Sequence, residues 1–418
     1  MAALAAGEPL SLYVHLPFCE ARCTYCGCMT IITQKREVAA RYLDYLDREI
    51  AMLAAHLGNR RRVVQHHWGG GTPTYLTPAQ IERLHATIAR CFDLDPGAET
   101  AIEIDPRVTT REQLTLLRTL GFNRLSMGVQ DFTAVVQEAI GRKQPEQLTK
   151  DVYDGARTLG FHSINMDLVY GLPMQTLDTF RQTLRSVAAM RPDRIAVYSY
   201  AHVPWLRPHQ SRIDASTLPD RHLKFELMGA AVDTFVEAGY ELIGIDHFAL
   251  PGDEIALAAR ERRLHRNFMG YTTRPAGDML GVGVSAIGDL AGAFAQNVKK
   301  LPPYYAAIDA DRFPIERGYT LTEDDLIRRH VIGELMCNFS VDRRDVATRF
   351  GIDFDAYFAE ELAALTGPGG PVEDGFLAVS RAALQVRDHG RLFVRNICMH
   401  FDRYLPAHAG RPVFSQTI

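Results

Sequence analysis

The sequence lacks a surplus of charge of either sign. Its 418 residues include 46 Lys and Arg against 50 Asp and Glu, which gives a formal net charge of −4. Nucleic-acid binding needs clustered surplus cations, so we expect no nucleic-acid partner. The sequence also lacks any apolar run near the roughly 20 residues that span a bilayer. The Ala-rich residues 1–9 lack the basic flank of a signal peptide. We therefore expect a cytoplasmic protein without a membrane span.

The sequence has only seven cysteines, and this odd number without a secretion signal argues against a disulfide framework. Three of them, Cys91, Cys337 and Cys398, are scattered along the chain and are expected to be small buried hydrophobic residues. The other four fall within ten residues, between Cys19 and Cys28. Such a cluster needs a chemical explanation.

Low-complexity segments and short solenoid repeats are absent, and the chain instead alternates between strand-like and helix-like patterns. Strands are predicted near Leu12–His15, Val63–Trp68, Ala101–Asp105, Arg124–Val129, Ile164–Tyr170, Arg194–Tyr200 and Glu241–Ile245. Helices are predicted at Val38–Leu57, Pro78–Cys91, Arg111–Leu120, Glu146–Leu159, Leu177–Met190 and Arg221–Ala238. This alternation predicts an α/β fold with a mostly parallel sheet, either open or closed into a full or partial barrel.

The alternation fades beyond about residue 250. The segment Thr322–Phe350 has a helical pattern, and Phe376–Val379 resembles a short strand. We therefore predict two domains, a barrel in residues 1–310 and a mainly helical C-terminal domain in residues 311–418.

The cysteine cluster follows the first predicted strand. A structural zinc site normally takes two pairs of ligands, and no second Cys/His pair stands at a usual spacing. The alternative is a [4Fe–4S] cluster held by Cys19, Cys23 and Cys26, which leaves one iron without a protein ligand. S-adenosylmethionine can bind that iron, and an electron from the cluster then cleaves it to a 5′-deoxyadenosyl radical. Cys-x3-Cys-x2-Cys, with Tyr25 before the third cysteine, is the signature of the radical S-adenosylmethionine superfamily.

Polar or glycine-rich residues follow five successive strands, at the edge where active sites of α/β barrels lie. Gly69–Thr72 would let a ligand approach the backbone, with amides free to donate. Carboxylates such as Asp167 suit ribose hydroxyls, and Arg142 suits the amino-acid end of the cofactor. Asp167 would equally fit a core carboxylate with a polar partner.

These residues belong to blocks in which the chain, from about Leu10 to its C-terminus, resembles the oxygen-independent coproporphyrinogen III oxidases. The blocks are Tyr13–Cys28, His67–Thr74, Glu103–Pro106, Arg124–Asp131, Asp167–Pro173, Tyr200–His202, Asp246–Phe248, His265–Phe268, Gly270–Thr273, Gly283–Ile287 and Arg395–Met399. The resemblance implies a partial (β/α)6 barrel that converts two propionates of coproporphyrinogen III to vinyl groups, giving protoporphyrinogen IX and carbon dioxide in haem synthesis.

The resemblance also assigns roles to individual residues. Cys19, Cys23 and Cys26 would hold the cluster, and Cys28, Glu103 and Tyr13 would act in catalysis. Two molecules of S-adenosylmethionine, bound side by side, would contact Tyr13, Tyr25, Gly70, Gly71, Thr72, Glu103, Gln130, Arg142, Asp167, Ala201 and Ile287. The partners would be the porphyrinogen substrate and an external electron donor, and the protein would be a monomer. Arg266 and Arg395 are candidates to bind substrate propionates, although an arginine is more often a solvated or structural residue.

The sequence departs from the family pattern at two points. Met29 follows Cys28 where an Asn is usual. Only about ten residues precede the first predicted strand, whereas family members have some tens there. We expect from this that S-adenosylmethionine cleavage is poorly coupled to decarboxylation, because a closing segment would be missing.

Three rival functions fit parts of the pattern. A haem-binding carrier of the same superfamily typically has Asp-Phe after the third cysteine, where this chain has Gly27-Cys28. A radical methyltransferase or a haem-degrading relative would share the barrel and the cysteine motif. A structural zinc protein would share only the cysteines.

Overall fold

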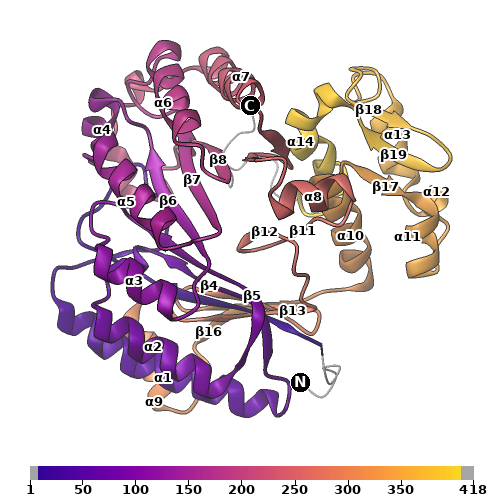
Figure 1. The fold of residues 1–418 in the computed structure, drawn as a ribbon. Helices are drawn as coiled ribbons and strands as arrows, with labels where there is room; N and C mark the ends of the chain where they lie inside the picture. Colours follow the sequence, from indigo (N-terminus) through magenta and orange to yellow (C-terminus); the bar gives the residue numbers. More distant parts are fainter. Residues whose placement is uncertain (1–7, 406–418) are drawn as a thin grey trace. The chain divides into compact units, whose positions relative to one another are not determined.

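The computed structural model describes residues 8–405, which form two compact units (Figure 1). The first unit runs to Ala238 and resumes with Arg274–Thr320, and the second comprises Gly239–Thr273 and the chain from Leu321 onward. The predicted boundary at residue 310 therefore differs from the observed division. Strand β16 (Ile315–Thr320) pairs with β15 (Ala293–Asn297) of the first unit, which moves the boundary to residue 320.

Six parallel strands form the centre of the first unit, as the alternating pattern predicted, and neighbouring strands pair in chain order. They are β1 (Leu10–Leu16), β4 (Arg62–Gly70), β5 (Asp93–Ile104), β6 (Arg124–Gln130), β7 (Ser163–Tyr170) and β8 (Arg194–Ser199). Because all six run in the same direction, their carboxyl ends meet at one edge of the sheet.

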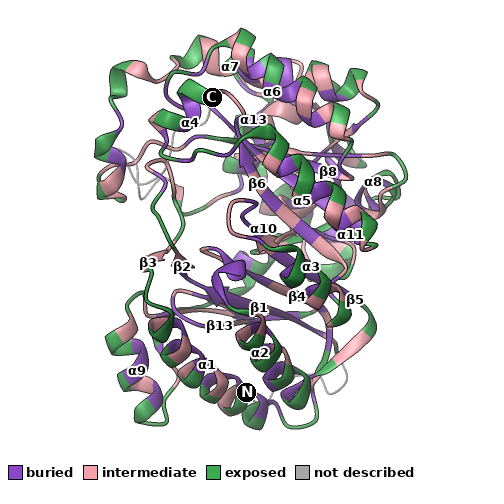
Figure 2. Cartoon of the chain, turned by 60° about the vertical axis from the view of Figure 1, so that its left-hand side comes forward, coloured by how far each residue is buried: buried purple, intermediate pink, exposed green. Residues whose placement is uncertain are grey.

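Helices connect these strands and cover the outside of the sheet (Figure 1). They are α1 (Arg36–Leu57), α2 (Pro78–Cys91), α3 (Arg111–Thr119), α4 (Ala134–Ala139), α5 (Glu146–Thr158), α6 (Leu177–Met190) and α7 (Arg221–Glu237). Each longer helix turns a buried face to the strands and an exposed face outward, as Figure 2 shows for α1 and α2. Thr77, Thr110 and Thr176 form capping boxes that fix the first residues of α2, α3 and α6.

The sheet continues beyond β1 in a way that the sequence pattern did not indicate. Strand β13 (Asp278–Val282) pairs with β1 in parallel. Antiparallel strands β14 (Ile287–Leu290), β15 and β16 follow, with α9 (Leu301–Asp309) between the last two. Strands β14, β15 and β16 are short. Most residues of β14 and β15 are only partly buried and all six residues of β16 are exposed, so these strands lack the long apolar runs by which the central strands were recognised.

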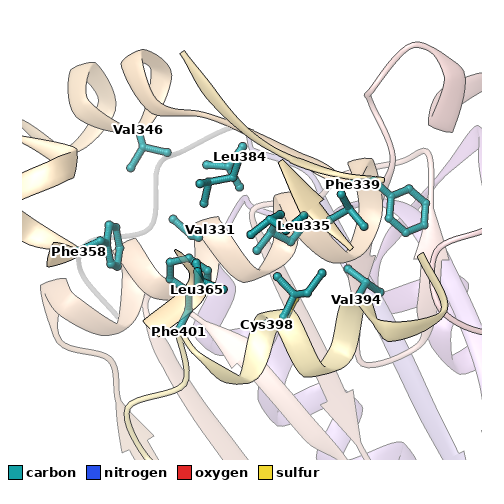
Figure 3. Close-up of a cluster of buried hydrophobic side chains, with 14 of the residues drawn as sticks. Val331, Leu335, Phe339, Val346, Phe358, Leu365, Leu384, Val394, Cys398 and Phe401 are labelled. Atoms are coloured by element: carbon teal, nitrogen blue, oxygen red, sulfur yellow. The ribbon is translucent and has the colours of Figure 1, made fainter. Parts of the chain in front are cut away.

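The second unit is built around a separate hydrophobic core in which Val331, Leu335, Phe358 and Phe401 are fully buried (Figure 3). Its helices are α8 (Glu254–Arg260), α10 (Glu323–Asn338), α11 (Arg343–Phe350), α12 (Phe354–Tyr357), α13 (Ala359–Thr366) and α14 (Val394–Met399). Its strands are β9 (Glu241–Ile243), β10 (His247–Ala249), β11 (His265–Asn267), β12 (Gly270–Thr272), β17 (Ser340–Asp342), β18 (Leu377–Val379) and β19 (Ala383–Val386).

Three expectations for this unit need correction or extension. The predicted helical stretch Thr322–Phe350 is interrupted, because Phe339 adopts a left-handed conformation and β17 follows it. The predicted strand Glu241–Ile245 forms an antiparallel hairpin with β10 rather than another parallel barrel strand. Residues 239–273 belong to this unit because Ile243, Ile255 and Tyr271 pack in one core with Cys337 of α10.

No helix in residues 8–405 combines the length and the apolar character that crossing a membrane requires. The expected poor coupling depends on the short segment before the first strand. Residues 1–7 of this segment lie outside the described residues.

A buried carboxylate joins the sheet extension to the barrel. Glu49 of α1 accepts hydrogen bonds of 2.7 Å from the Gly283 amide, the Asn297 side chain and the Tyr304 hydroxyl. Burial raises the pKa of Glu49 to about 7, although these three hydrogen bonds act in the opposite direction. Glu49 thus connects α1 to the turn after β13, to β15 and to α9.

We predict that Glu49 makes stability fall as the pH rises from 4.5 to about 7. The folded protein keeps the proton on Glu49 up to about pH 7, whereas the unfolded chain releases it near 4.5, so folding is favoured most below this window. The slope is at most roughly 1.4 kcal/mol per pH unit. Glu49→Gln should remove this slope in chemical unfolding curves, while Glu37→Gln, an exposed change in the same helix, should keep it. A wild-type slope in Glu49→Gln would contradict the assignment of this pH dependence to Glu49.

Candidate active site

The cysteine loop leaves the end of β1 and is closed at its base by two short strands. These are β2 (Phe18–Cys19) and β3 (Ile31–Ile32), which pair in parallel. The Sγ atom of Cys19 lies 3.4 Å from the hydroxyl of Thr72, just after β4. The loop is therefore fixed against the carboxyl end of the neighbouring strand.

The glycines after β4 make this close contact possible. A Cβ atom on Gly71 would lie 2.6 Å from the backbone of Pro17, and one on Gly69 would lie 2.5 Å from Glu103. The expectation that these amides are free to donate to a ligand is not met. The amide of Gly70 donates to Glu103, the amide of Gly71 to the Leu16 carbonyl and the amide of Thr72 to the Phe18 carbonyl. The glycine turn holds the cysteine strand instead.

A second set of contacts holds the middle of the cysteine loop. The carbonyls of Tyr25, Cys26 and Gly27 lie within hydrogen-bonding distance of Gln210, His209 and Arg207, at 2.9, 2.7 and 2.8 Å. These three side chains come from the segment after β8, around the short helix η2 (Pro208–Arg212). Three successive peptide carbonyls are thus fixed by one distant segment, and no sequence pattern indicated this pairing.

Glu103, at the end of β5, accepts hydrogen bonds from the Gly70 amide at 3.0 Å and lies 3.3 Å from Nε2 of His67. Burial alone would raise the pKa of Glu103, but His67 and Gly70 hold it below its ordinary value. Tyr13 stacks on His67, and its hydroxyl lies 3.0 Å from Nδ1 of His15. Glu103 is therefore an ionised carboxylate in a fixed position.

Asp105 and two arginines form a charged cluster beside Cys23. Asp105 accepts from Arg107 at 2.6 Å and from Arg142 at 3.0 Å. The Nη atoms of Arg107 and Arg142 approach the Sγ atom of Cys23 to 3.8 and 3.9 Å. Nε of Arg142 is buried and makes no hydrogen bond to the protein, which leaves this side chain able to bind a further acceptor.

Polar groups on β6 and β7 form the opposite side of the site. Asp167 accepts from Ser126 at 2.9 Å and from Asn165 at 2.7 Å. Asp167 therefore has polar partners within the protein, as a core carboxylate would need. Gln130 has a positive φ of 68°, where the register of β6 against β7 shifts. Such a conformation is uncommon outside glycine and often occurs at functional sites.

The cysteine thiols differ in acidity. A hydrogen bond from Cys28 lowers the pKa of Cys26 to about 6 against the effect of burial, and the same bond raises the pKa of Cys28. Burial raises the pKa of Cys19 to about 11. Cys26 is thus more easily converted than Cys19 or Cys28 to the thiolate that binds metals.

Most of the predicted site residues line one cavity of ≈ 170 Å³. These are Cys19, Cys23, Tyr25, Cys26, Cys28, Gly70, Gly71, Thr72, Glu103, Gln130, Arg142 and Asp167. Tyr13, Ala201 and Ile287 do not line it. Ala201 lies in a neighbouring cavity of ≈ 530 Å³, and Tyr25 contributes to the walls of both cavities.

The donor set fits an iron–sulfur cluster better than a single metal ion. Within the described residues, no group of three or more His, Cys, Asp or Glu side chains converges on one point where a single metal ion could bind. Cys19, Cys23 and Cys26 instead stand around a cavity. In a four-iron cluster each thiolate binds a different iron, so such ligands surround a volume.

Sequence reasoning missed Arg107, Ser126 and the three residues that hold the cysteine loop. Arg107 and Ser126 line the cavity. Arg107 follows the end of β5, and Ser126 lies within β6, in a segment that the sequence had already marked. Their position could have identified them. No local pattern distinguishes Arg207, His209 and Gln210, because their partners are almost 200 residues away in the chain.

Comparisons with known proteins agree with this geometry. Residues 13–187 match the model of the radical SAM superfamily, so the barrel and the cysteine loop define a radical S-adenosylmethionine protein. Residues 321–393 match the HemN C-terminal domain. The chain belongs to the family of oxygen-independent coproporphyrinogen III oxidases, to which the following relatives connect it.

The relative from a Synechocystis species, an oxygen-independent coproporphyrinogen III oxidase, is 46% identical over 414 residues, which cover 98% of this chain and 88% of that protein. The relative of the same name from Escherichia coli is 45% identical and covers 98% and 89%. A solved structure, described as coproporphyrinogen III oxidase (HemN) from Escherichia coli, a radical SAM enzyme, superposes with a TM-score of 0.92 at 46% identity. That match covers 95% of this chain and 91% of the solved one.

We predict that Gly71→Ala displaces the cysteine strand, because its Cβ atom would lie 2.6 Å from the Pro17 backbone. Overpacking of this kind costs about 1–3 kcal/mol. The variant should lose stability by that amount and retain less iron after anaerobic reconstitution. Gly27→Ala, in the cysteine loop, is the matched control, because a Cβ atom on Gly27 would meet nothing within 4 Å. Equal iron content and stability in both variants would disprove the close-contact argument.

Proposed function

We propose that this protein catalyses the oxygen-independent oxidative decarboxylation of coproporphyrinogen III. Two propionates become vinyl groups, and the products are protoporphyrinogen IX and two molecules of carbon dioxide, a step of haem synthesis. The observation that carries the proposal is the convergence of Cys19, Cys23 and Cys26 with the polar strand ends on one cavity. Family membership supports the same reaction.

Cys19, Cys23 and Cys26 would hold a [4Fe–4S] cluster whose fourth iron takes S-adenosylmethionine. When bound, these groups would supply a radical that removes a hydrogen atom from a propionate β-carbon, after which one further electron passes to an external one-electron acceptor and carbon dioxide leaves. The residues on the cavity wall would bind and orient the cofactor. Two cofactor molecules are proposed, because Tyr25 stands between two adjacent cavities and Ala201 lines the second one.

The charges around the cavity suit different parts of S-adenosylmethionine. Glu103 is fixed by Gly70 and His67 and can accept from the amino group of the cofactor. Asp167, oriented by Ser126 and Asn165, can accept from ribose hydroxyls. Arg142 keeps a buried Nε donor without a protein partner and can pair with a carboxylate.

Cys28 would act in catalysis without binding iron, whereas Tyr13, expected to be catalytic, would be a positioning residue. Cys28 is exposed on the cavity wall, and its amide lies 3.4 Å from Sγ of Cys26. A thiol in this position can exchange a hydrogen atom or a proton with the substrate. Tyr13 is hydrogen-bonded to His15 and would orient the end of β1 rather than contact the cluster cavity. The presence of Cys28 also favours the oxidase over a haem carrier, which typically has Asp-Phe after the third cysteine.

The substrate brings four carboxylates, which need cations. Arg266 and Arg395 of the second unit are exposed. Burial alone would raise the pKa of Asp246, but His247 lowers it, and Arg266 and Arg395 each add to the lowering, so both arginines act on the same carboxyl group. The Arg266 guanidinium lies over the ring of Tyr271, 5.4 Å from its centroid. We assign these two arginines to propionate binding. The protein would work as a cytoplasmic monomer supplied with electrons by an external donor.

We predict that protein reconstituted without oxygen holds about four irons and four sulfides per chain. It should convert coproporphyrinogen III to protoporphyrinogen IX when given S-adenosylmethionine and a reductant. Alanine at Cys19, Cys23 or Cys26 should abolish the iron, whereas Cys28→Ser should keep the iron and lose product. Product masses from the same assay separate the alternatives, because methyl gain or ring opening would indicate a different reaction. Zinc in place of iron would refute the proposal.

A second prediction concerns Asp167. Asp167→Asn keeps the volume but removes a charged acceptor, and charged hydrogen bonds are worth roughly 1.5–3 kcal/mol. The variant should bind S-adenosylmethionine about 10–100-fold more weakly with its full iron content, measured by equilibrium binding to the reconstituted protein. Asp178→Asn, in the first turn of α6, serves as the control. Unchanged affinity in Asp167→Asn would make this residue purely structural.

A further inference from the structure

Two arginines from different loops reach the same cysteine. Arg107 follows β5 and Arg142 follows α4, and their Nη atoms lie 3.8 and 3.9 Å from Sγ of Cys23. Cys23 is only 9% exposed. The other two cysteines of the motif have different partners, since Cys19 faces the Thr72 hydroxyl and Cys26 the amide of Cys28. Cys23 is thus set apart by its two guanidinium neighbours.

Asp105 fixes the two arginines in this arrangement. Arg107 donates to Asp105 through its backbone amide at 3.0 Å, through Nε at 3.0 Å and through Nη2 at 2.6 Å. Arg142 donates to the same carboxylate at 3.0 Å and to the Gly128 carbonyl at 2.7 Å. Nη2 of Arg107 contacts both Asp105 and Cys23, while Nε donates to the other carboxylate oxygen and fixes the plane of the guanidinium. A lysine has a single nitrogen and could not be held at two points in this way.

The cluster of Asp105, Arg107 and Arg142 carries one net positive charge next to Cys23. Two guanidinium groups share a single carboxylate, and the side chains of Asp105 and Arg142 are each 8% exposed. Charges in such a buried position interact more strongly than on the surface. Reduction of a [4Fe–4S] cluster by one electron adds one negative charge, and hydrogen bonds to the sulfurs and nearby charge set its potential.

We propose that Arg107, oriented by Asp105, raises the reduction potential of the cluster bound at Cys23, so that Arg107 is a positioning residue for electron uptake. This rests on the proposed function, because it requires the iron–sulfur cluster. Arg107 acts through the Cys23 sulfur and not on the substrate. It differs in this from Arg142, whose unpartnered Nε is available to the cofactor.

The test is a redox titration of reconstituted full-length protein without S-adenosylmethionine, followed by electron paramagnetic resonance. Arg107→Gln should lower the ratio of reduced to oxidised cluster at a fixed potential about tenfold, which corresponds to about 59 mV for a one-electron couple. Asp105→Asn removes the negative charge but keeps an amide oxygen that can accept from Arg107, so it should shift the potential in the opposite direction. Arg111→Gln removes an exposed charge four residues further on and should leave the potential unchanged.

The outcomes separate this inference from the proposed function. Wild-type protein that assembles no iron–sulfur cluster would refute the proposed function and the inference together. Full iron content with an unchanged potential in Arg107→Gln would overturn the inference alone, as would shifts of the same sign in Arg107→Gln and Asp105→Asn. Weaker S-adenosylmethionine binding at an unchanged potential would also overturn it. If Arg107→Gln fails to assemble the cluster, the test uses Arg107→Lys, which keeps the charge but not the planar fork. Arg107→Lys should lower the reduction potential by a smaller amount. A wild-type potential in Arg107→Lys would overturn the inference.

Discussion

The close contact between the glycine turn and the cysteine strand is the constraint on which the site depends. Gly71 can lie against Pro17 only because it has no side chain. This contact lets the amides of Gly71 and Thr72 bond to the carbonyls of Leu16 and Phe18. The first cysteine is then held beside Thr72. Without this contact the loop would leave the barrel edge, and the polar strand ends would have no thiols to face.

The electrostatics of the cavity follow from the pairing of its charges. Asp105 is surrounded by Arg107 and Arg142, and Glu103 by His67 and the Gly70 amide. An unpaired charge would be costly at Asp105, whose side chain is 8% exposed, and in both pairs the partners keep the carboxylate ionised. The same pairing orients each group toward the cavity. Binding chemistry and folding stability therefore depend on the same contacts at this edge of the sheet.

The chain divides by packing and not by its order in the sequence. Residues 239–273 precede the last strands of the first unit, yet their apolar side chains share a core with α10. The strands β13–β16 return to the first unit, where Glu49 ties them to α1. Arg266 therefore belongs to the second unit together with Arg395, although 128 residues separate them in the sequence. The division explains why a single boundary in the chain described the domains poorly.

The sequence by itself determined the cysteine motif, the six central strands and most helix limits, because these depend on local spacing, apolar runs and threonine caps such as Thr77. It also marked the strand ends, since parallel strands must end at the same edge. Only the tertiary structure decided which groups meet there. Gln210 donates a hydrogen bond to the Tyr25 carbonyl, 185 positions away in the chain. Arg107 approaches Cys23 from a different loop. Contacts of this kind depend on how the whole sheet closes around the loop, and no local pattern encodes them.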